Sequence, residues 1–175
     1  MSSKSPYINE GWGWYLATGV VMICSSLLGW AQFMPPAIHS FGPLYVDFIS
    51  SPVGLGTGPD AIGGYLMIAC GFVFVGHALF LMRHTIADLP LWLVIVNATT
   101  VSYIVLSVAQ FYQIQHWINA RNTSGEFTTP SGRTLTTFDG GPGVGAGLSV
   151  IAMGLAIGAT VLLYRQVNVQ LAKAK

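Results

Sequence analysis

Residues 144–164 read VGAGLSVIAMGLAIGATVLLY, an apolar stretch of 21 residues without one charged side chain. A helix of about 20 residues rises about 30 Å, which matches the hydrocarbon thickness of a lipid bilayer. Buried helices of soluble proteins are rarely that long and that free of charge. The stretch therefore predicts a helix that crosses a membrane.

Three further stretches have the same character and contain no Lys, Arg, Asp or Glu: residues 14–33, 62–82 and 89–112. The whole chain of 175 residues is 53% hydrophobic and only 7% charged, whereas soluble domains carry about 25% charged residues. So little charge leaves too little polar surface for a water-soluble protein. We therefore predict one all-α integral membrane domain over residues 1–175, built as a bundle of four transmembrane helices.

The distribution of Lys and Arg predicts the orientation of the bundle. Arg121 and Arg133 lie on one side of the predicted membrane, and five positive residues lie on the other: Lys4, Arg83, Arg165, Lys173 and Lys175. Cytoplasmic segments carry an excess of Lys and Arg. We therefore expect both termini in the cytoplasm, the loops 34–61 and 113–143 on the outer side, and a location in the plasma (inner) membrane.

The two predicted outer loops differ in composition. Loop 34–61 is largely apolar, but five prolines exclude a continuous helix: Pro35, Pro36, Pro43, Pro52 and Pro59. This Pro/Gly-rich loop is expected to cap the bundle or lie along the membrane interface. In loop 113–143, segments 127–129 and 133–138 flank the turn at residues 130–132, which predicts a small β-hairpin.

Small residues recur on one face of two predicted helices. They are Gly64, Gly71 and Ala78 in one helix, and Gly143, Gly147, Gly154 and Gly158 in the other. Their intervals of four and seven bring each set to a single helix face. Such smooth faces let a neighbouring backbone approach closely in lipid. We expect these faces to pack inside the bundle or against another chain.

A polar stripe marks the third predicted helix, and its members are Thr100, Tyr103, Ser107 and Gln110. Asn97 lies about one turn earlier, on a neighbouring arc. Because unpaired polar groups are costly in lipid, this face should contact protein or a polar cavity. The sequence leaves three interpretations open: hydrogen bonds between helices, a ligand site of the quinone type, and contact with a partner subunit.

His77 is the one histidine inside a predicted span. A haem held by two histidines needs a second ligand on a facing helix. His84 follows seven residues later on the same helix and cannot face His77, so a haem would require a ligand from a partner chain. Otherwise His77 should hydrogen-bond to a neighbouring helix. Cys24 and Cys70 are expected to be inert buried thiols, although a disulfide between them is also compatible with the sequence.

His39 and His116 fall near the predicted outer surface. Together with Met34 and Asp47 they form a candidate copper or zinc site. No two of these residues show a local ligand spacing such as HxxxH. Surface or interface histidines are therefore the alternative interpretation.

Several classes of function find no support in the sequence. It has no Gly-x-Ser-x-Gly or HExxH motif, no charged residue in a predicted span for transport, and no lysine there for a retinal. The net charge of +1 does not favour nucleic acid as a partner. The topology is similar to that of claudins and tetraspanins, but their paired extracellular cysteines are absent, so no family is assigned.

Our leading hypothesis is a non-catalytic accessory or structural subunit of a larger membrane complex. The complex would be of the respiratory or oxidase, membrane monooxygenase or lipid-transport type, with other integral membrane subunits and lipids as partners. The alternative is a redox subunit that binds a cofactor at His77 or a metal at His39 and His116. The sequence implies no particular cofactor.

Overall fold

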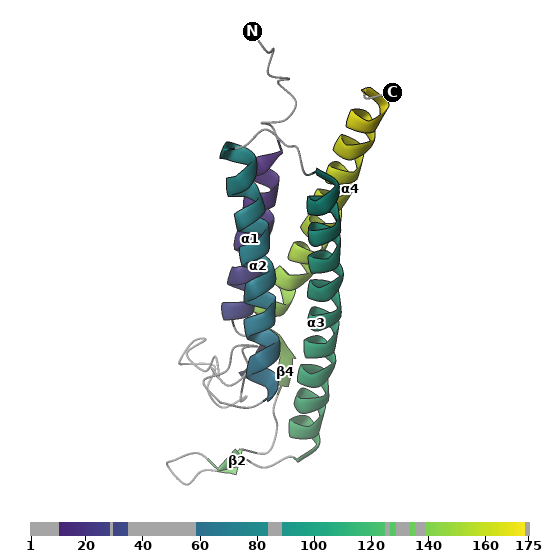
Figure 1. Ribbon diagram of the computed structural model, residues 1–175. Coiled ribbons are helices and arrows are strands. Elements are labelled where there is room, and N and C mark those ends of the chain that lie inside the picture. The colour runs from purple at the N-terminus through teal and green to yellow at the C-terminus, as the bar shows by residue number, and fades with distance from the viewer. Residues whose placement is uncertain are drawn as a thin grey trace.

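Four helices form an elongated bundle in the computed structural model (Figure 1): α1 (Trp12–Leu27), α2 (Pro59–Arg83), α3 (Leu89–Ser124) and α4 (Val144–Lys173). The structure describes residues 11–28, 30–34, 59–83, 89–124, 127–128, 134–135 and 139–173. Successive helices run in opposite directions, so α1 begins and α4 ends at the same end of the bundle. Because α1 and α3 each pack against both α2 and α4, the helices form a closed ring.

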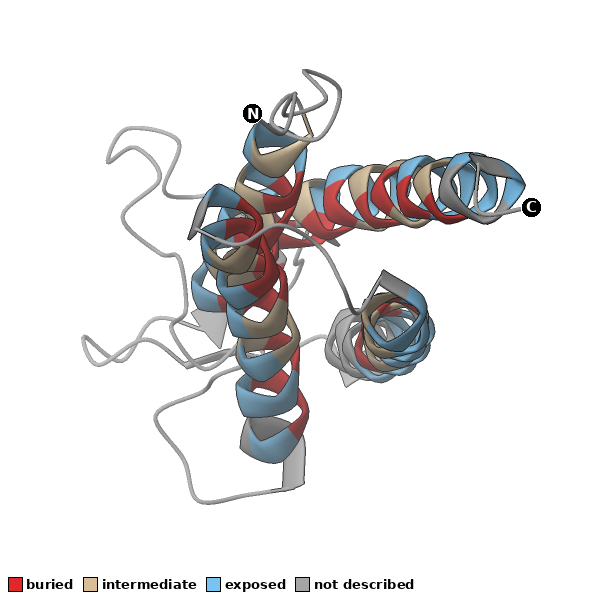
Figure 2. Cartoon of the chain, turned by 45° about the horizontal axis from the view of Figure 1, so that its top comes forward, coloured by how far each residue is buried: buried red, intermediate tan, exposed pale blue. Residues whose placement is uncertain are grey.

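Three helices contain segments long and apolar enough to cross a membrane, namely Ile62–Met82, Pro90–Gln113 and Val144–Val169. Large apolar side chains cover their outer faces, and the buried residues lie on the faces turned toward one another (Figure 2). An apolar exterior is what a lipid environment requires. These features indicate a multi-pass membrane protein.

The first helix is shorter than the sequence predicts. The predicted span 14–33 is wrong at its end, because α1 stops at Leu27 and Leu28 is extended. The 16 residues of α1 rise about 24 Å, less than the hydrocarbon thickness of about 30 Å. The hydroxyls of Ser25 and Ser26 both donate to the Met22 carbonyl, 2.7 and 2.9 Å away, within the last turn. Such bonds compete with the helical pattern.

Where α1 ends, the chain forms a strand that sequence analysis missed. Strand β1 (Ala31–Met34) pairs antiparallel with β4 (Asp139–Pro142), with Ala31 opposite Pro142 and Met34 opposite Asp139. This pairing satisfies backbone groups that a continuing helix would have satisfied. It also joins the end of α1 to the residues that precede α4.

The third and fourth helices run beyond the predicted spans. α3 continues to Ser124 rather than ending at residue 112, and α4 continues to Lys173 rather than ending at residue 164. Neither extension contains glycine or proline, and the first glycine after α3 is Gly125. Polar residues end a membrane span, but they do not by themselves end a helix. The predicted loop 113–143 therefore begins as helix.

The two predicted outer loops are described only in part. Strand β2 (Phe127–Thr128) pairs antiparallel with β3 (Thr134–Leu135), at the position where the sequence predicts a hairpin. Residues 35–58, which hold most of the predicted apolar cap, lie outside the described residues.

Candidate functional site

The polar stripe of α3 faces the interior and connects α3 to two other helices. The Thr100 hydroxyl lies 3.0 Å from that of Thr160 on α4, and the Tyr103 hydroxyl lies 2.7 Å from that of Ser25 on α1. Thr100 also donates to the Val96 carbonyl at 2.8 Å. For Thr100 and Tyr103, the structure therefore shows hydrogen bonds between helices.

The other two members of the stripe are also buried. Gln110 packs against Gly63 of α2, where an added Cβ would collide with the amide nitrogen of Gln110. Ser107 lies near the Tyr103 hydroxyl, but its oxygen makes no hydrogen bond to a described residue. The stripe thus reaches α1, α2 and α4 from a single face of α3.

His77 is fully buried between aromatic rings. The ring centroids of Tyr15 and Trp92 each lie 4.6 Å from the imidazole centroid, with Tyr15 edge-on and Trp92 tilted. Neither imidazole nitrogen has a hydrogen-bond partner among the described residues. Buried polar groups usually have such partners. The expected bond from His77 to a neighbouring helix is therefore not seen within the described part of the chain.

The small residues of α2 face inward. Gly64, Gly71 and Ala78 are all buried. At Gly71 the backbone of α2 meets that of α1 directly, because an added Cβ would lie 2.8 Å from the Gly19 carbonyl oxygen. Two helices can approach this closely only where both lack side chains.

The small residues of α4, with Gly143 directly before it, divide between two environments. Gly143 is buried, and its N–H donates to the Trp30 carbonyl at 2.7 Å. Gly158 lies beside Trp14, whose ring would be 3.4 Å from an added Cβ. Gly147 and Gly154 are exposed, and an added Cβ at either would meet nothing within 4 Å. Half of the predicted groove therefore faces away from the bundle.

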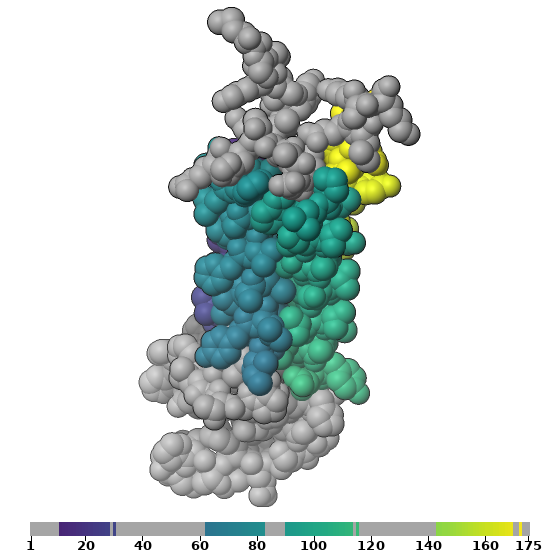
Figure 3. All heavy atoms as spheres, in the orientation of Figure 1, coloured from purple at the N-terminus to yellow at the C-terminus, as the bar shows by residue number. Residues whose placement is uncertain are grey.

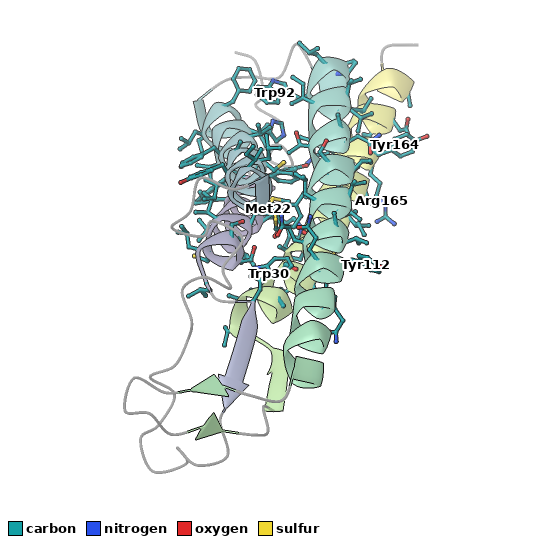
Figure 4. The ribbon with its side chains drawn as sticks, turned by 90° about the horizontal axis from the view of Figure 1, so that it is seen from below. Met22, Trp30, Trp92, Tyr112, Tyr164 and Arg165 are labelled. Atoms are coloured by element: carbon teal, nitrogen blue, oxygen red, sulfur yellow. The ribbon has the colours of Figure 1, made fainter. Side chains whose placement is uncertain are left out.

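Large side chains of the helices likewise point either into the bundle or away from it. Figure 4 shows Met22 and Trp30 pointing into the space between the helices, and Tyr112, Tyr164 and Arg165 pointing away from it. Trp30 is fully buried, and its indole N–H donates to the Ser25 carbonyl at 2.7 Å.

The structure brings no metal ligands together within its described part. There, no group of three or more His, Cys, Asp or Glu side chains lies close enough to hold a metal ion. His39 and Asp47 lie outside the described residues, as do the side chains of Met34 and His116. Cys24 is exposed, Cys70 is half-buried, and both are free thiols, so the disulfide considered from the sequence is not formed.

A groove of about 530 Å³ lies between α2 and α3 on the face seen in Figure 3. Apolar side chains form most of its wall, and Cys70, Thr99 and Ser102 add small polar groups. Its lining does not include the polar stripe that we considered as a quinone site. The groove opens sideways, toward the space that lipid occupies around a membrane protein.

Comparisons with known proteins do not assign the chain to a family. No family model matches the sequence, no curated protein matches it, and no solved structure matches the fold.

Proposed function

We propose that this protein is a non-catalytic subunit of a larger membrane assembly, with other integral membrane subunits and lipids as its partners. The observation that carries the proposal is the outward-facing pair Gly147 and Gly154, at which an added Cβ would meet nothing within 4 Å. The assembly would be of the respiratory or oxidase, membrane monooxygenase or lipid-transport type.

The physical reason lies in how helices associate in lipid. Lipid tails are as apolar as leucine, so close packing and hydrogen bonds hold membrane helices together. Gly147 and Gly154 are two turns apart on one face of α4. The neighbouring side chains of Val150, Ile151 and Ile157 are exposed. A helix of another subunit that enters this shallow groove gains contact along its backbone.

We further propose that α1, with the extended segment after it, completes a fourth crossing, so that both termini lie in the cytoplasm. The last residues of α2 and α4, Arg83 and Lys173, lie at the same end of the bundle (Figure 1). Positive residues favour the cytoplasmic side of a membrane. This supports a plasma-membrane protein with loops 34–61 and 113–143 on the outer side.

Gly154→Leu is expected to release the partner subunits, because its side chain fills the groove on α4. The tagged full-length chain would be purified in mild detergent from its own membranes, and co-purifying subunits would be quantified by mass spectrometry. We expect recovery of the partners to fall at least about tenfold, since about 1.4 kcal/mol of lost packing suffices for that change.

Gly76→Leu is the matched control for this experiment. Gly76 is also exposed on a membrane helix with nothing within 4 Å of an added Cβ, so it undergoes the same chemical change. The partner subunits should remain bound to the Gly76→Leu variant. A wild-type chain that purifies alone from its native membranes, or equal retention of partners by both variants, would refute the proposal.

The imidazole of His77, which has no hydrogen-bond partner among the described residues, favours a second candidate, a subunit that binds a redox cofactor. His77 and a residue of a partner chain would hold a haem, which would supply electron transfer when bound. Because Tyr15 and Trp92 lie against the imidazole, one of these rings would have to move to admit the cofactor.

His77→Phe tests the second candidate, because phenylalanine keeps an aromatic ring between Tyr15 and Trp92 but offers no ligand atom. If His77 binds a haem, the native complex absorbs visible light and the variant loses that absorption. Retained thermal stability of the variant serves as the control for folding. A complex without visible absorption, or a variant with unchanged absorption, would eliminate the second candidate.

A further inference from the structure

The outer face of α3 carries a regular seam of exposed side chains. Its members are separated alternately by three and four residues: Leu91, Val94, Ala98, Val101, Val105, Val108 and Tyr112. This spacing is the heptad repeat by which two helices wind around each other with interlocking side chains. All seven side chains are exposed, so within the described residues none of them is covered by another helix of this chain.

Two polar residues flank this seam at membrane depth. Asn97 precedes Ala98 and Ser102 follows Val101, both within the membrane segment Pro90–Gln113. Both side chains are exposed, and neither makes a hydrogen bond to a described residue. Lipid offers no partner to an amide or a hydroxyl, so each bond left unmade is a cost.

The spacing of Asn97 and Ser102 makes the seam self-complementary. In two parallel helices packed through heptads, the residue directly before an a position faces a residue of the partner helix whose number is five higher. In this seam Ala98 is an a position, and Asn97 precedes it. Asn97 and Ser102 are five positions apart. Two copies of this chain have the same orientation in a membrane, so their α3 helices are parallel and their residues lie at matching depths.

A two-fold axis therefore brings the Asn97 of each copy opposite the Ser102 of the other, which gives two equivalent contacts per dimer. An amide donates and accepts hydrogen bonds, and so does a hydroxyl, so each pair is compatible in either direction. The same contact covers the outer flank of the groove between α2 and α3, because Val101, Ser102 and Val105 line that groove as well.

We propose that α3 is a dimer interface at which two copies of this chain pack in parallel through the seam, joined by hydrogen bonds between Asn97 and Ser102. This contact leaves Gly147 and Gly154 on α4 free for other subunits, so it does not depend on the proposed function. Tyr112, at the end of the seam, points away from the bundle (Figure 4).

Cysteine cross-linking tests the geometry of the interface. Val101→Cys and Val105→Cys would be made in the full-length chain with Cys24→Ala and Cys70→Ala, reconstituted at high lipid-to-protein ratio and oxidised. Both positions should give a covalent dimer at least several-fold faster than Phe72→Cys. Phe72 is equally exposed to lipid, but on α2. Equal cross-linking at the three positions would indicate random collision and overturn the proposal.

Asn97→Leu tests the hydrogen bonds. This variant loses both interhelical hydrogen bonds of the dimer. Two such bonds in a membrane stabilise a dimer enough that their loss should raise the dissociation constant about tenfold. The constant would be measured in bilayers by single-molecule photobleaching of the labelled full-length chain. Ser102→Ala should produce a similar increase.

Asn168→Leu is the control, because Asn168 is an exposed asparagine on α4, away from the seam. Its dissociation constant should equal that of the wild type. A wild-type chain that stays monomeric at all lipid dilutions, or an Asn97→Leu dimer as tight as the wild type, would overturn the proposal. Either result would leave the proposed partners of α4 to be tested separately.

Discussion

Gly71→Val is expected to lower the free energy of unfolding by about 3 kcal/mol, because overfilling a closely packed contact costs up to about that amount. An added Cβ at Gly71 would lie 2.6 Å from Ile23 Cγ1 and 2.8 Å from the Gly19 carbonyl oxygen. The reciprocal position is as tight, since an added Cβ at Gly19 would lie 2.6 Å from the Gly71 carbonyl oxygen. Backbone atoms cannot rotate away as a side chain can, so α1 and α2 must separate.

The measurement is unfolding of the purified chain by a denaturing detergent in mixed micelles, with Gly76→Val as the matched control. Gly76 lies on the same helix, and an added Cβ there meets nothing within 4 Å. Both variants make the same change in helix propensity on the same helix, and only Gly71→Val places side-chain atoms against α1. The additional loss at Gly71 therefore measures the contact with α1. If the two variants lose equal stability, the close approach at Gly19 and Gly71 does not hold α1 and α2 together.

The membrane segments could be predicted from the sequence because lipid imposes a simple rule on length and charge. The predicted span 62–82 has the same bounds as the apolar segment of α2, and the spans 89–112 and 144–164 fall within α3 and α4. The ends of α1, α3 and α4 could not be predicted from hydropathy. α3 continues to Ser124, beyond the edge of the apolar stretch, and α1 ends shortly before β1, which pairs with a segment over 100 residues away in the sequence.

Which face of each helix points into the bundle was harder to predict than the helix itself. In a soluble protein polar residues point outward, but in lipid both the core and the surface are apolar. The polar stripe through Thr100 and Tyr103 was recognisable because hydroxyls avoid lipid. The small residues in and before α4 do not share one environment, since Gly143 and Gly158 contact the rest of the chain while Gly147 and Gly154 face outward.

The proposed α3 interface was not predicted from the sequence for the same reason. Asn97 is a neighbour of the polar stripe in sequence, but three residues turn an α-helix by about 300°, so Asn97 lies about 60° from Thr100 around α3 and is exposed. The regular seam beside it consists mainly of valines, which are ordinary in any membrane helix. The exposure of each side chain in the structure shows that the seam and Asn97 share one uncovered face.

Trp30→Ala is expected to cost about 3–5 kcal/mol of stability, the range found for removing a large aromatic side chain from a core. Trp30 is fully buried where α1 gives way to β1. Its indole N–H donates to the Ser25 carbonyl at 2.7 Å, and its ring lies 6.5 Å from that of Phe111 on α3. Gly145 at the start of α4 has no side chain where the ring sits, since an added Cβ there would lie 2.6 Å from Trp30 Cδ1.

The loss at Trp30 should exceed the loss at Trp14, a partly exposed tryptophan of α1. Trp14 is 43% exposed, although its indole N–H also donates to a carbonyl, that of Leu155 at 3.2 Å. Trp14→Ala should therefore cost only about 1–2 kcal/mol, because less packing is lost. The two variants would be compared by the same detergent unfolding. Equal losses would contradict the assignment of Trp30 as the anchor of this region.

Trp30→Phe separates the indole hydrogen bond from the bulk of the ring. Phenylalanine keeps most of the contact with Gly145 and Phe111 but leaves the Ser25 carbonyl without its donor, so a loss of about 1–2 kcal/mol is expected. Ser25 is also the partner of Tyr103 in the interior. A larger loss than this would mean that the indole positions Ser25 for its bond to α3, and that a single side chain at the end of α1 secures the contacts of that helix with both α3 and α4.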